Sequence, residues 1–311
     1  MKTRTSHIMM VRPSSFGVNL QTSSTNAFQS LIPQLDADEI QEKAIEEFDN
    51  MVKTLKKNGI NVAVIFDSKE PEKPDAIFPN NWVTFQEDGT VVLFPMFAPN
   101  RRFERRRSIL DLIGTQFKIK SEIDLSHYEE DEVFLEGTGS MILDKVNKVC
   151  YACISERTCP ELLNEYCEKF NYKLLSFEAL DENNIPIYHT NVMLSVADKF
   201  AVVCLESVKN PKEKEILVKQ FKNTNKDIID ISFNQMKCLA SNVIELENEK
   251  GENILVMSQR AEHSFSNEQL QVIKKYSKIV AVPIPTIEKI GGGGTRCMIA
   301  EIFLPEKWTE D

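Results

Sequence analysis

The sequence IGGGGTRCM, residues 290–298, places four consecutive glycines shortly before a cysteine. A strand-like segment, residues 279–283, precedes it, and an apolar stretch, residues 297–303, follows it. Glycines between two strands permit positive φ and let a ligand approach the backbone closely. Cys297 therefore stands where a nucleophile could lie. A buried structural thiol beside a glycine loop is the alternative, because free cysteine is among the most buried residue types.

The start of the last strand belongs to a pattern that recurs along the chain. Five times a polar or glycine-containing lead-in introduces a short apolar run. The leading positions are Asn81, Gly139, Asn191, Asn242 and Arg296, with spacings of 58, 52, 51 and 54 residues. A period of this size is typical of solenoids, propellers and arrays. The sequence therefore predicts five similar units.

Most units continue in the same order, with a turn, a second strand, a helical pattern and a third strand. We expect helices at 101–113, 159–170, 211–222 and 266–276, and third strands at 116–120, 173–177, 228–232 and 279–282. The N-terminal portion supplies a strand at 7–12, a helix at 36–58 and a strand at 60–66. These parts complete the unit that the C-terminus begins. We therefore predict one α/β domain over residues 1–311, a closed ring of five ββαβ units. Two ordinary α/β domains are the alternative.

Composition excludes several classes of partner. The 311 residues carry a net charge of −10, which argues against a nucleic-acid or membrane-surface partner, because binding phosphate needs a basic face. No apolar run approaches the length of a transmembrane helix, and the one near the N-terminus is too short for a signal peptide. Seven cysteines in such a chain indicate reduced thiols and a cytoplasmic location. Cys150 and Cys153 have metal-like spacing, but no second Cys or His pair stands nearby, so we expect no metal.

Pseudo-symmetry brings the starts of the first strands to one axis. Cys297, His189 and Glu136 come from three different units and occupy equivalent positions there. A thiol becomes a nucleophile as thiolate, helped by an adjacent base. A carboxylate beside glycines can orient a substrate N–H or hold an imidazole. The set suits acyl-type transfer at a carbon that bears nitrogen. Taken singly, a hydrogen-bonded core histidine and a solvated turn glutamate are the ordinary alternatives.

Four motifs in order resemble those of the guanidine-group-modifying superfamily. They are FLEGTG at 134–139, ISERT at 154–158, YHTN at 188–191 and GGGGTRCM at 291–298. This superfamily contains arginine deiminase, dimethylarginine dimethylaminohydrolase and glycine amidinotransferase. The resemblance spans nearly the whole chain. It implies the five-bladed α/β-propeller, or pentein, with pseudo-fivefold symmetry, and an enzyme that needs no cofactor.

The resemblance also implies roles for individual residues. Cys297 would be the nucleophile, His189 the general acid and base, and Glu136 a side chain that grips the substrate nitrogens. Gly293 and Gly294, in the glycine run, would approach the substrate. Arg157 would support the site or bind a carboxylate.

Amides stand where the arginine-processing members carry acids. Asn191 lies two positions after the histidine, and Asn80 and Asn81 stand in the FPNNW segment at 78–82. Acids clamp a cationic guanidinium with charge-assisted hydrogen bonds, about twice as strong as neutral ones. A neutral ureido group does not need them, and an amide both donates and accepts. FPNNW, together with MVRP at 10–13, also resembles a bacterial branch described as citrulline hydrolases or amidinotransferase-like proteins. We therefore expect a citrulline-like substrate and the products ornithine, ammonia and carbon dioxide.

Charged residues near the FPNNW segment are candidates for the amino-acid end of the substrate. Arg101 and Arg102 begin the basic stretch RRFERRR at 101–107, and either could bind an α-carboxylate bidentately. Asp75 could bind the α-ammonium group. A solvated basic helix start and an ordinary turn aspartate are the alternatives.

Other functions remain compatible with these residues. The alternatives are an arginine or methylarginine deiminase or dimethylaminohydrolase, an amidinotransferase that passes the group to a second amine, and an inert binding protein with the same fold. We expect a small amino-acid substrate, and a homo-oligomer is compatible with this interpretation.

Overall fold

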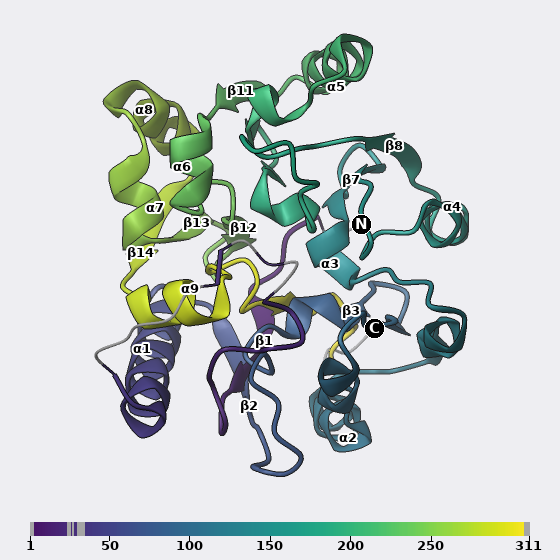
Figure 1. Ribbon diagram of the computed structural model, residues 1–311, viewed down its shortest axis with the longest axis vertical. Helices are drawn as coiled ribbons and strands as arrows, with labels where there is room; N and C mark the ends of the chain where they lie inside the picture. The colour runs from purple at the N-terminus through teal and green to yellow at the C-terminus, as the bar shows by residue number, and fades with distance from the viewer. Residues whose placement is uncertain (1–2, 24–25, 27, 30–34, 308–311) are drawn as a thin grey trace.

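A computed structural model describes residues 3–23, 26, 28–29 and 35–307. Their strands form five three-stranded sheets, and in each sheet the middle strand is antiparallel to the first strand and parallel to the third. The sheets surround a common centre, and their long helices α1, α2, α4, α5 and α8 lie around the outside (Figure 1). The expected ββαβ propeller is confirmed.

The two ends of the chain build the first blade together. Its strands are β15 (Ala300–Glu301), β1 (His7–Arg12) and β2 (Asn61–Phe66), in that spatial order. Helix α1 (Ala37–Lys57) connects β1 to β2 and begins with a capping box between Asp36 and Glu39. Its buried residues Ile40, Ala44, Phe48, Met51 and Leu55 recur every three or four positions, which is the spacing of one helix face. The shared blade confirms how the ring was expected to close. The assignment of residues 1–311 to a single domain stays a prediction.

The other four blades follow in chain order, each with its helix between the second and third strands. They comprise β3 (Val83–Phe85), β4 (Thr90–Leu93), α2 (Arg107–Gln116) and β5 (Ser121–Asp124); β6 (Ile142–Asp144), β7 (Val149–Cys153), α4 (Pro160–Lys169) and β8 (Lys173–Phe177); β9 (Leu194–Val196), β10 (Phe200–Val203), α5 (Pro211–Asn223) and β11 (Asp227–Asp230); β12 (Ile244–Glu247), β13 (Asn253–Ser258), α7 (Gln259–Ser264), α8 (Asn267–Tyr276) and β14 (Lys278–Val282).

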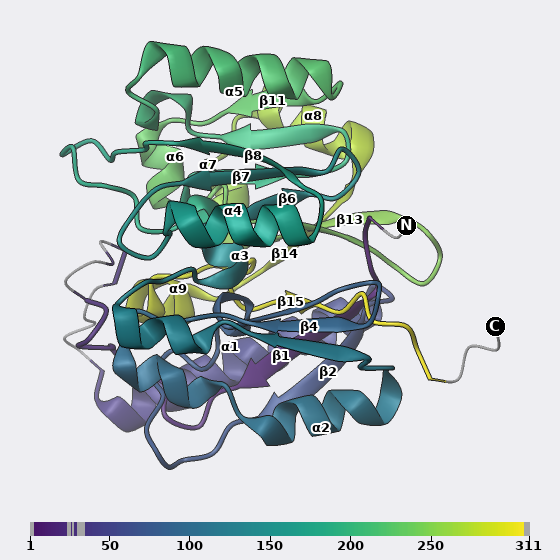
Figure 2. The same cartoon turned by 90° about the vertical axis from the view of Figure 1, so that its right-hand side faces the viewer.

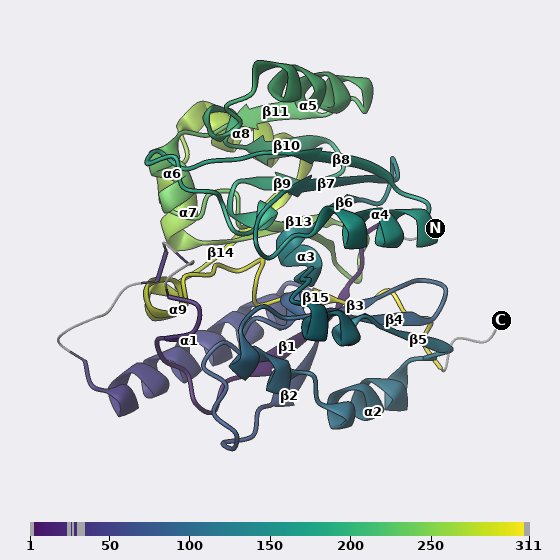
Figure 3. The same ribbon diagram turned by 45° about the vertical axis from the view of Figure 1, so that its right-hand side comes forward.

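Short helices fill the remaining connections: η1 (Pro79–Asn81), η2 (Pro99–Glu104), η3 (Ser126–Asp131), α3 (Gly137–Ser140), η4 (Thr190–Val192), η5 (Leu205–Ser207), α6 (Phe233–Lys237) and α9 (Pro285–Gly291). Of these, α3 packs against η1 and η4 near the axis. Figure 3 shows α3 near the middle of the molecule, between β15 and β3 on one side and β6 and β13 on the other. Figure 2 gives the side view, with α5 and α2 at opposite ends.

Two elements differ from the bounds that the sequence predicts. The third strand of the second blade was expected at 116–120, but β5 begins at Ser121. Three of its four side chains are exposed, so this edge strand lacks the apolar alternation that reveals a strand. Phe117 and Lys118 instead join the C-terminal segment, where the Lys118 N–H donates to the Pro305 carbonyl at 2.7 Å.

The helix expected at 101–113 is divided. Its first part is the 3₁₀ turn η2, and α2 begins only at Arg107, because Arg105 and Arg106 have non-helical backbone angles. This break turns Arg101 and Glu104 toward the interior, where both are buried.

Apolar side chains between the blades form the core, in four clusters of buried residues. Among the described residues, no helix combines the length and apolar content that crossing a membrane requires.

Candidate active site

The axial turns carry the polar side chains that the sequence analysis singled out. Asn80 and Asn81 lie on η1, Glu136 stands directly before α3, and His189 stands directly before η4, which contains Asn191. All five are buried. Helix α3 packs against both η1 and η4. The structure therefore gathers these side chains on turns at the centre rather than on the strands themselves.

Glycines permit this close packing. Gly137 has a φ of +46°, and a Cβ there would lie 2.5 Å from the Asn80 carbonyl oxygen. A Cβ at Gly139 would lie 2.3 Å from Asn81 Nδ2 and 2.9 Å from His189 Nδ1. Heavier side chains at these two positions would push the turns apart. The glycines of the FLEGTG motif thus hold Asn81 beside the imidazole.

Glu136 and His189 form a buried pair. His189 Nε2 lies 2.6 Å from Glu136 Oε2, and the Phe97 N–H donates to Glu136 Oε1 at 3.0 Å. Arg157 Nη1 lies 3.5 Å from the same Oε2. Burial opposes ionisation of Glu136, but Arg157 and His189 bring its pKa well below the ordinary value. The ionised carboxylate accepts from Nε2–H and leaves His189 Nδ1 for proton transfer. Of the roles considered for Glu136, holding the imidazole is the one that fits this geometry.

Burial decides the protonation state of His189. Desolvation lowers the pKa of its imidazole, although the contact with Glu136 works in the opposite direction. Arg157 and Arg101 lower this pKa further. The lowered pKa favours the neutral imidazole, which can accept a proton.

Two amides hold the thiol of Cys297. Asn242 Nδ2 donates to Sγ at 3.1 Å, and Asn191 Nδ2 donates to it at 3.3 Å. Burial raises the pKa of Cys297, while these donors and the positive charge of Arg296 oppose the rise. The raised pKa favours the thiol, and two hydrogen-bond donors are already in place for a thiolate.

Asn242 also fixes the glycine run. Its Oδ1 accepts from the Gly294 N–H at 3.1 Å and from the Cys297 N–H at 3.4 Å. A Cβ at Gly293 would lie 2.8 Å from the Phe78 ring and 3.3 Å from Cys297 Cβ. The glycine run is thus a tightly packed wall beside the thiol rather than an open loop.

Asn242 opens the fourth repeat and was expected at the axis with the other leading residues, but no catalytic or binding role was predicted for it. The position was visible in the sequence, but its contact with sulfur depends on the folded glycine run.

The two candidate arginines lie in different surroundings. Arg101 is buried, and its guanidinium bonds Glu104 and Asn81. Arg102 is half-buried and turns to the Met96 carbonyl and to Glu129. The structure therefore brings Arg101, but not Arg102, to the other site residues. Glu104 is a second residue that the sequence analysis did not select. A charged pair three positions apart usually lies on a surface, which is why its burial was not expected.

Asp75 lies beside the same arginine, with Oδ2 3.9 Å from Arg101 Nε. Asn19 donates to Oδ2 at 2.7 Å, and Thr22 also bonds it. Burial raises the pKa of Asp75, and Arg101 opposes the rise. The other oxygen, Oδ1, is buried and has no hydrogen-bonding partner among the described residues. This oxygen can accept from a bound ammonium group.

Three amide atoms of the site are also buried and unpartnered within the described part of the chain. They are Oδ1 of Asn80, Nδ2 of Asn81 and Oδ1 of Asn191. Native structures rarely leave buried polar atoms unsatisfied, so a cluster of such atoms indicates a ligand. One donor and two acceptors are available.

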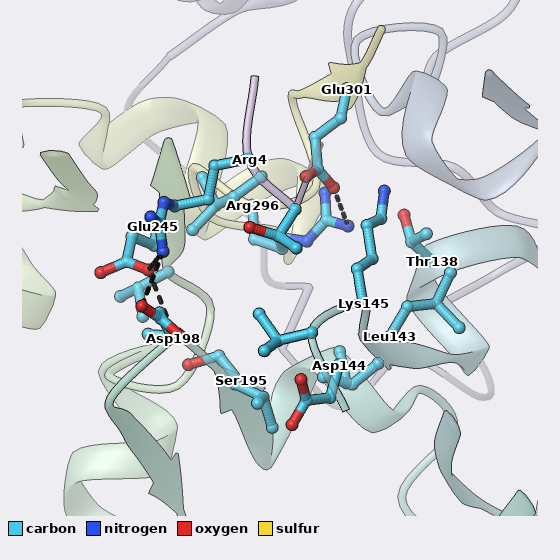
Figure 4. Close-up of a pocket in the computed structure, with 17 residues that line it drawn as sticks. Arg4, Thr138, Leu143, Asp144, Lys145, Ser195, Asp198, Glu245, Arg296 and Glu301 are labelled. Atoms are coloured by element: carbon cyan, nitrogen blue, oxygen red, sulfur yellow. Dashed lines mark hydrogen bonds and ion pairs between the residues drawn. The ribbon is translucent and has the colours of Figure 1, made fainter. Parts of the chain in front are cut away.

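A separate polar pocket is lined by Thr138, which follows Gly137 on α3, and by Arg296, the neighbour of Cys297 (Figure 4). Several of its charged side chains pair with one another, as Arg4 does with Asp198 at 3.1 Å and Arg296 with Glu301 at 3.3 Å. Neither the thiol nor the imidazole lines it, so we assign no part of the chemistry to it. In the described residues no group of three or more His, Cys, Asp or Glu side chains is arranged to hold a metal ion.

Comparison with known proteins places this geometry in context. A family model described as N,N dimethylarginine dimethylhydrolase, eukaryotic, matches residues 12–304. A search of the curated proteins finds no match.

Among solved structures, the N-terminal domain of ArgZ is similar to this chain. ArgZ is an arginine dihydrolase from the ornithine-ammonia cycle in cyanobacteria, and the domain is a cysteine-to-serine variant bound to its substrate. The TM-score is 0.74 at 15% identity, covering 96% of this chain and 98% of that chain. Against apo ArgZ the values are 0.73 and 16%, covering 96% of this chain but 41% of that one. This chain therefore spans about two-fifths of that protein.

A dimethylarginine dimethylaminohydrolase is also similar. Its histidine-to-glycine variant, as an adduct with S-methyl-L-thiocitrulline, gives a TM-score of 0.65 at 16% identity, covering 95% of this chain and 99% of that chain. At such identities the structural likeness establishes the fold.

Proposed function

The chain belongs to the family described as eukaryotic N,N dimethylarginine dimethylhydrolase, and from that premise we propose that it is a cysteine-dependent hydrolase of a ureido amino acid resembling citrulline. The products are the amine, which is ornithine in the case of citrulline, with ammonia and carbon dioxide.

The observation that carries the choice of substrate is the orientation of Asn81. Its Oδ1 accepts from Arg101 at 2.9 Å, so its Nδ2 is the atom left for a ligand. A guanidinium group has only N–H donors and cannot accept from Nδ2. A ureido oxygen can accept from it. Asn191 directs Nδ2 to the sulfur, so its Oδ1 remains to accept from the ureido NH₂.

The absence of charge on the three amides of the site also favours a ureido substrate. Asn80, Asn81 and Asn191 carry no charge, so a cation at the reacting carbon would be buried against neutral amides. Burying an uncompensated charge costs several kcal/mol. A neutral ureido group avoids this cost. The carboxylate nearest the imidazole, Glu136, is already neutralised by Arg157.

In the first half-reaction, the sulfur of Cys297 attacks the ureido carbon as His189 Nδ1 takes the thiol proton. The C–N bond to the side-chain nitrogen breaks, and His189 returns the proton to this departing amine. A carbamoyl thioester remains on Cys297. Glu136 stabilises the imidazolium that forms between the two transfers.

In the second half-reaction, His189 takes a proton from water as its oxygen attacks the thioester carbon. The C–S bond breaks, and the thiolate regains its proton from the imidazolium. The released carbamic acid decomposes to ammonia and carbon dioxide. The donors from Asn191 and Asn242 stabilise the sulfur each time it carries negative charge.

Asp75 and Arg157 complete the proposed site. The unpartnered Oδ1 of Asp75 accepts from the substrate α-ammonium group. Arg157 supports Glu136 and is a candidate for an electrostatic contact with the α-carboxylate. A cytoplasmic location and a homo-oligomer stay predictions.

Product analysis of the purified protein tests this proposal. With citrulline as the only organic substrate, we expect ornithine and ammonia in equal amounts. Cys297→Ala should abolish both products. Arginine, methylated arginines and agmatine are tested in parallel. Ornithine from arginine at a higher kcat/KM than from citrulline would refute the ureido substrate. Product formation only in the presence of a second amine would instead identify a transferase. Binding of citrulline without any product would identify a binding protein.

A further inference from the structure

A second cavity lies on the side of the molecule that carries α6, α7 and α9 (Figure 1). Its volume is about 510 Å³, which is within the range of small-molecule sites. Most of its lining residues are apolar, among them Ile185, Ile187, Tyr188, Phe233, Met236 and Leu239. Neither Cys297, His189 nor Glu136 lines it. The proposed chemistry therefore makes no use of this cavity.

One carboxyl group at the cavity has no hydrogen-bonding partner. Glu288, on α9, lines the cavity and is only 2% exposed, and its Oε1 makes no hydrogen bond with the described residues. Burial raises the pKa of Glu288 to about 7, the hydroxyl of Ser258 and the charge of Arg260 oppose the rise, and Glu47 adds to it. A buried acceptor without a partner is costly, and a cationic N–H donor from a ligand would satisfy it.

A guanidinium group without an ion pair stands at the same place. Arg260, on α7, lines the cavity together with Glu288, and its side chain is exposed. It makes no ion pair or hydrogen bond within the described part of the chain. By contrast, Lys237 on the same cavity pairs with Glu182. Because the charge of Arg260 acts on Glu288, the two groups lie close enough for one small ligand to contact both.

We propose that this cavity is a second binding site, for an α-amino acid with a large apolar side chain. Glu288 accepts from the ligand ammonium group, Arg260 donates to the ligand carboxylate, and the apolar wall encloses the side chain. A simple amine or a simple acid would satisfy only one of the two charged groups. The ureido side chain of citrulline fits this apolar wall poorly, so the site goes beyond the proposed function.

The cavity is next to the active site although it is separate from it. Tyr188 lies against His189, with ring centroids 4.7 Å apart, and its hydroxyl donates to the Gly292 carbonyl at 3.3 Å. Helix α9, which carries Glu288, ends at Gly291, where the glycine run begins. A ligand in the cavity would therefore contact both segments that lead to the catalytic residues.

Isothermal titration calorimetry of the purified protein with L-phenylalanine tests the proposal. We expect saturable binding of one molecule per chain, which saturating citrulline should not displace. Hydrocinnamate lacks the ammonium group that contacts Glu288, so it should bind about 10- to 100-fold more weakly. Phenethylamine lacks only the carboxylate that contacts the exposed Arg260, so it should bind about two- to fivefold more weakly.

Two variants separate the two contacts. Glu288→Gln should weaken L-phenylalanine about 10- to 100-fold and leave the affinity for hydrocinnamate unchanged. Arg260→Gln should weaken L-phenylalanine about two- to fivefold and leave the affinity for phenethylamine unchanged. Lys237→Gln is the matched control, because Lys237 lines the same cavity but is paired with Glu182. Since Arg260 is exposed, its variant keeps the test decisive if Glu288→Gln does not fold, which thermal unfolding would reveal.

No saturable binding up to about 10 mM L-phenylalanine would overturn the proposal. Displacement by citrulline would overturn it too, because that result puts the probe in the active site. So would an affinity for L-phenylalanine that neither Glu288→Gln nor Arg260→Gln changes. Binding is measured without turnover, so the result does not depend on whether the protein hydrolyses citrulline.

Discussion

The variant Asn81→Asp would test the proposed preference for a ureido substrate, because it replaces the single atom Nδ2 with an oxygen. The carboxylate can keep one oxygen on Arg101 Nη1, at the 2.9 Å that Asn81 Oδ1 now occupies. Its second oxygen replaces Nδ2, the buried donor that has no other partner in the described part of the chain. The change therefore converts a donor into a charged acceptor with almost no change in volume. Arg101 should keep the new carboxylate ionised.

The expected change in substrate preference follows from two hydrogen bonds, one that the ureido oxygen loses and one that a guanidinium gains. The ureido oxygen loses a donor and faces an anion, which costs about 1–3 kcal/mol. A guanidinium gains a charge-assisted bond of about 1.5–3 kcal/mol. Together these effects shift the preference by about 2.5–6 kcal/mol. That corresponds to a change of about 10²- to 10⁴-fold in the ratio of kcat/KM for citrulline to kcat/KM for arginine.

Initial rates of ornithine release at low substrate concentration give this ratio directly. Thermal unfolding of the variant controls for loss of folded protein. Asn81→Ala is the matched variant that removes the donor without adding charge, so it should lose activity on citrulline without gaining any on arginine. A shift of less than about threefold for Asn81→Asp, or a shift toward citrulline, would refute the reasoning.

Three further outcomes are expected. Asn242→Ala removes the donor that lies 3.1 Å from Cys297 Sγ. We therefore expect kcat/KM to fall about 10- to 100-fold and alkylation of Cys297 to slow. An unchanged rate of alkylation would contradict the contact between Asn242 and the sulfur. Gly139→Ala puts a Cβ 2.3 Å from Asn81 Nδ2 and 2.9 Å from His189 Nδ1, so kcat/KM should fall about 100-fold while thermal unfolding shifts only modestly. Burial lowers the pKa of His189 below its ordinary 6.5 and raises the pKa of Cys297 above its ordinary 9.0. Because the productive free enzyme holds a neutral imidazole and a thiol, kcat/KM should fall on the acid side only below pH 6.5 and on the alkaline side only above pH 9.0. A fall in kcat/KM between pH 6.5 and pH 9.0 in the measured pH profile would contradict these protonation states of His189 and Cys297.

Much of the fold was predictable because the repeat is carried by local signals. Each unit begins with a polar residue before an apolar run and continues with a helix of ordinary periodicity. The helices α4, α5 and α8 begin within one residue of their expected starts. The strand β5 could not be found in this way, because its exposed edge shows little apolar alternation. Family membership confirms the superfamily and the class of hydrolases acting on non-peptide C–N bonds.

The site was predictable only where symmetry brings residues to the axis. Cys297, His189 and Glu136 occupy equivalent positions in three units, so their convergence followed from the repeat. The surroundings of Arg101 did not follow from it. They depend on the break between η2 and α2, which buries Arg101 and Glu104 together. A charged stretch such as RRFERRR gives no indication of which side chain turns inward.

The partners of the thiol illustrate the same limit. Asn191 was selected because it stands where related enzymes carry an acid. Asn242 had no such marker, although it is the nearer donor to Cys297 Sγ. Its role arises from the folded glycine run, whose Gly294 N–H it also binds.

The most direct test of the central claim is a competition between citrulline and arginine for the wild-type enzyme. Both substrates are present at equal concentration, each with a different isotope in its ornithine part, and the labelled ornithine is followed by mass spectrometry. The ratio of the two initial rates equals the ratio of their kcat/KM values. We expect ornithine to derive predominantly from citrulline, and Cys297→Ala to produce none. Ornithine derived predominantly from arginine would contradict the proposal that the amides of this site select a ureido group.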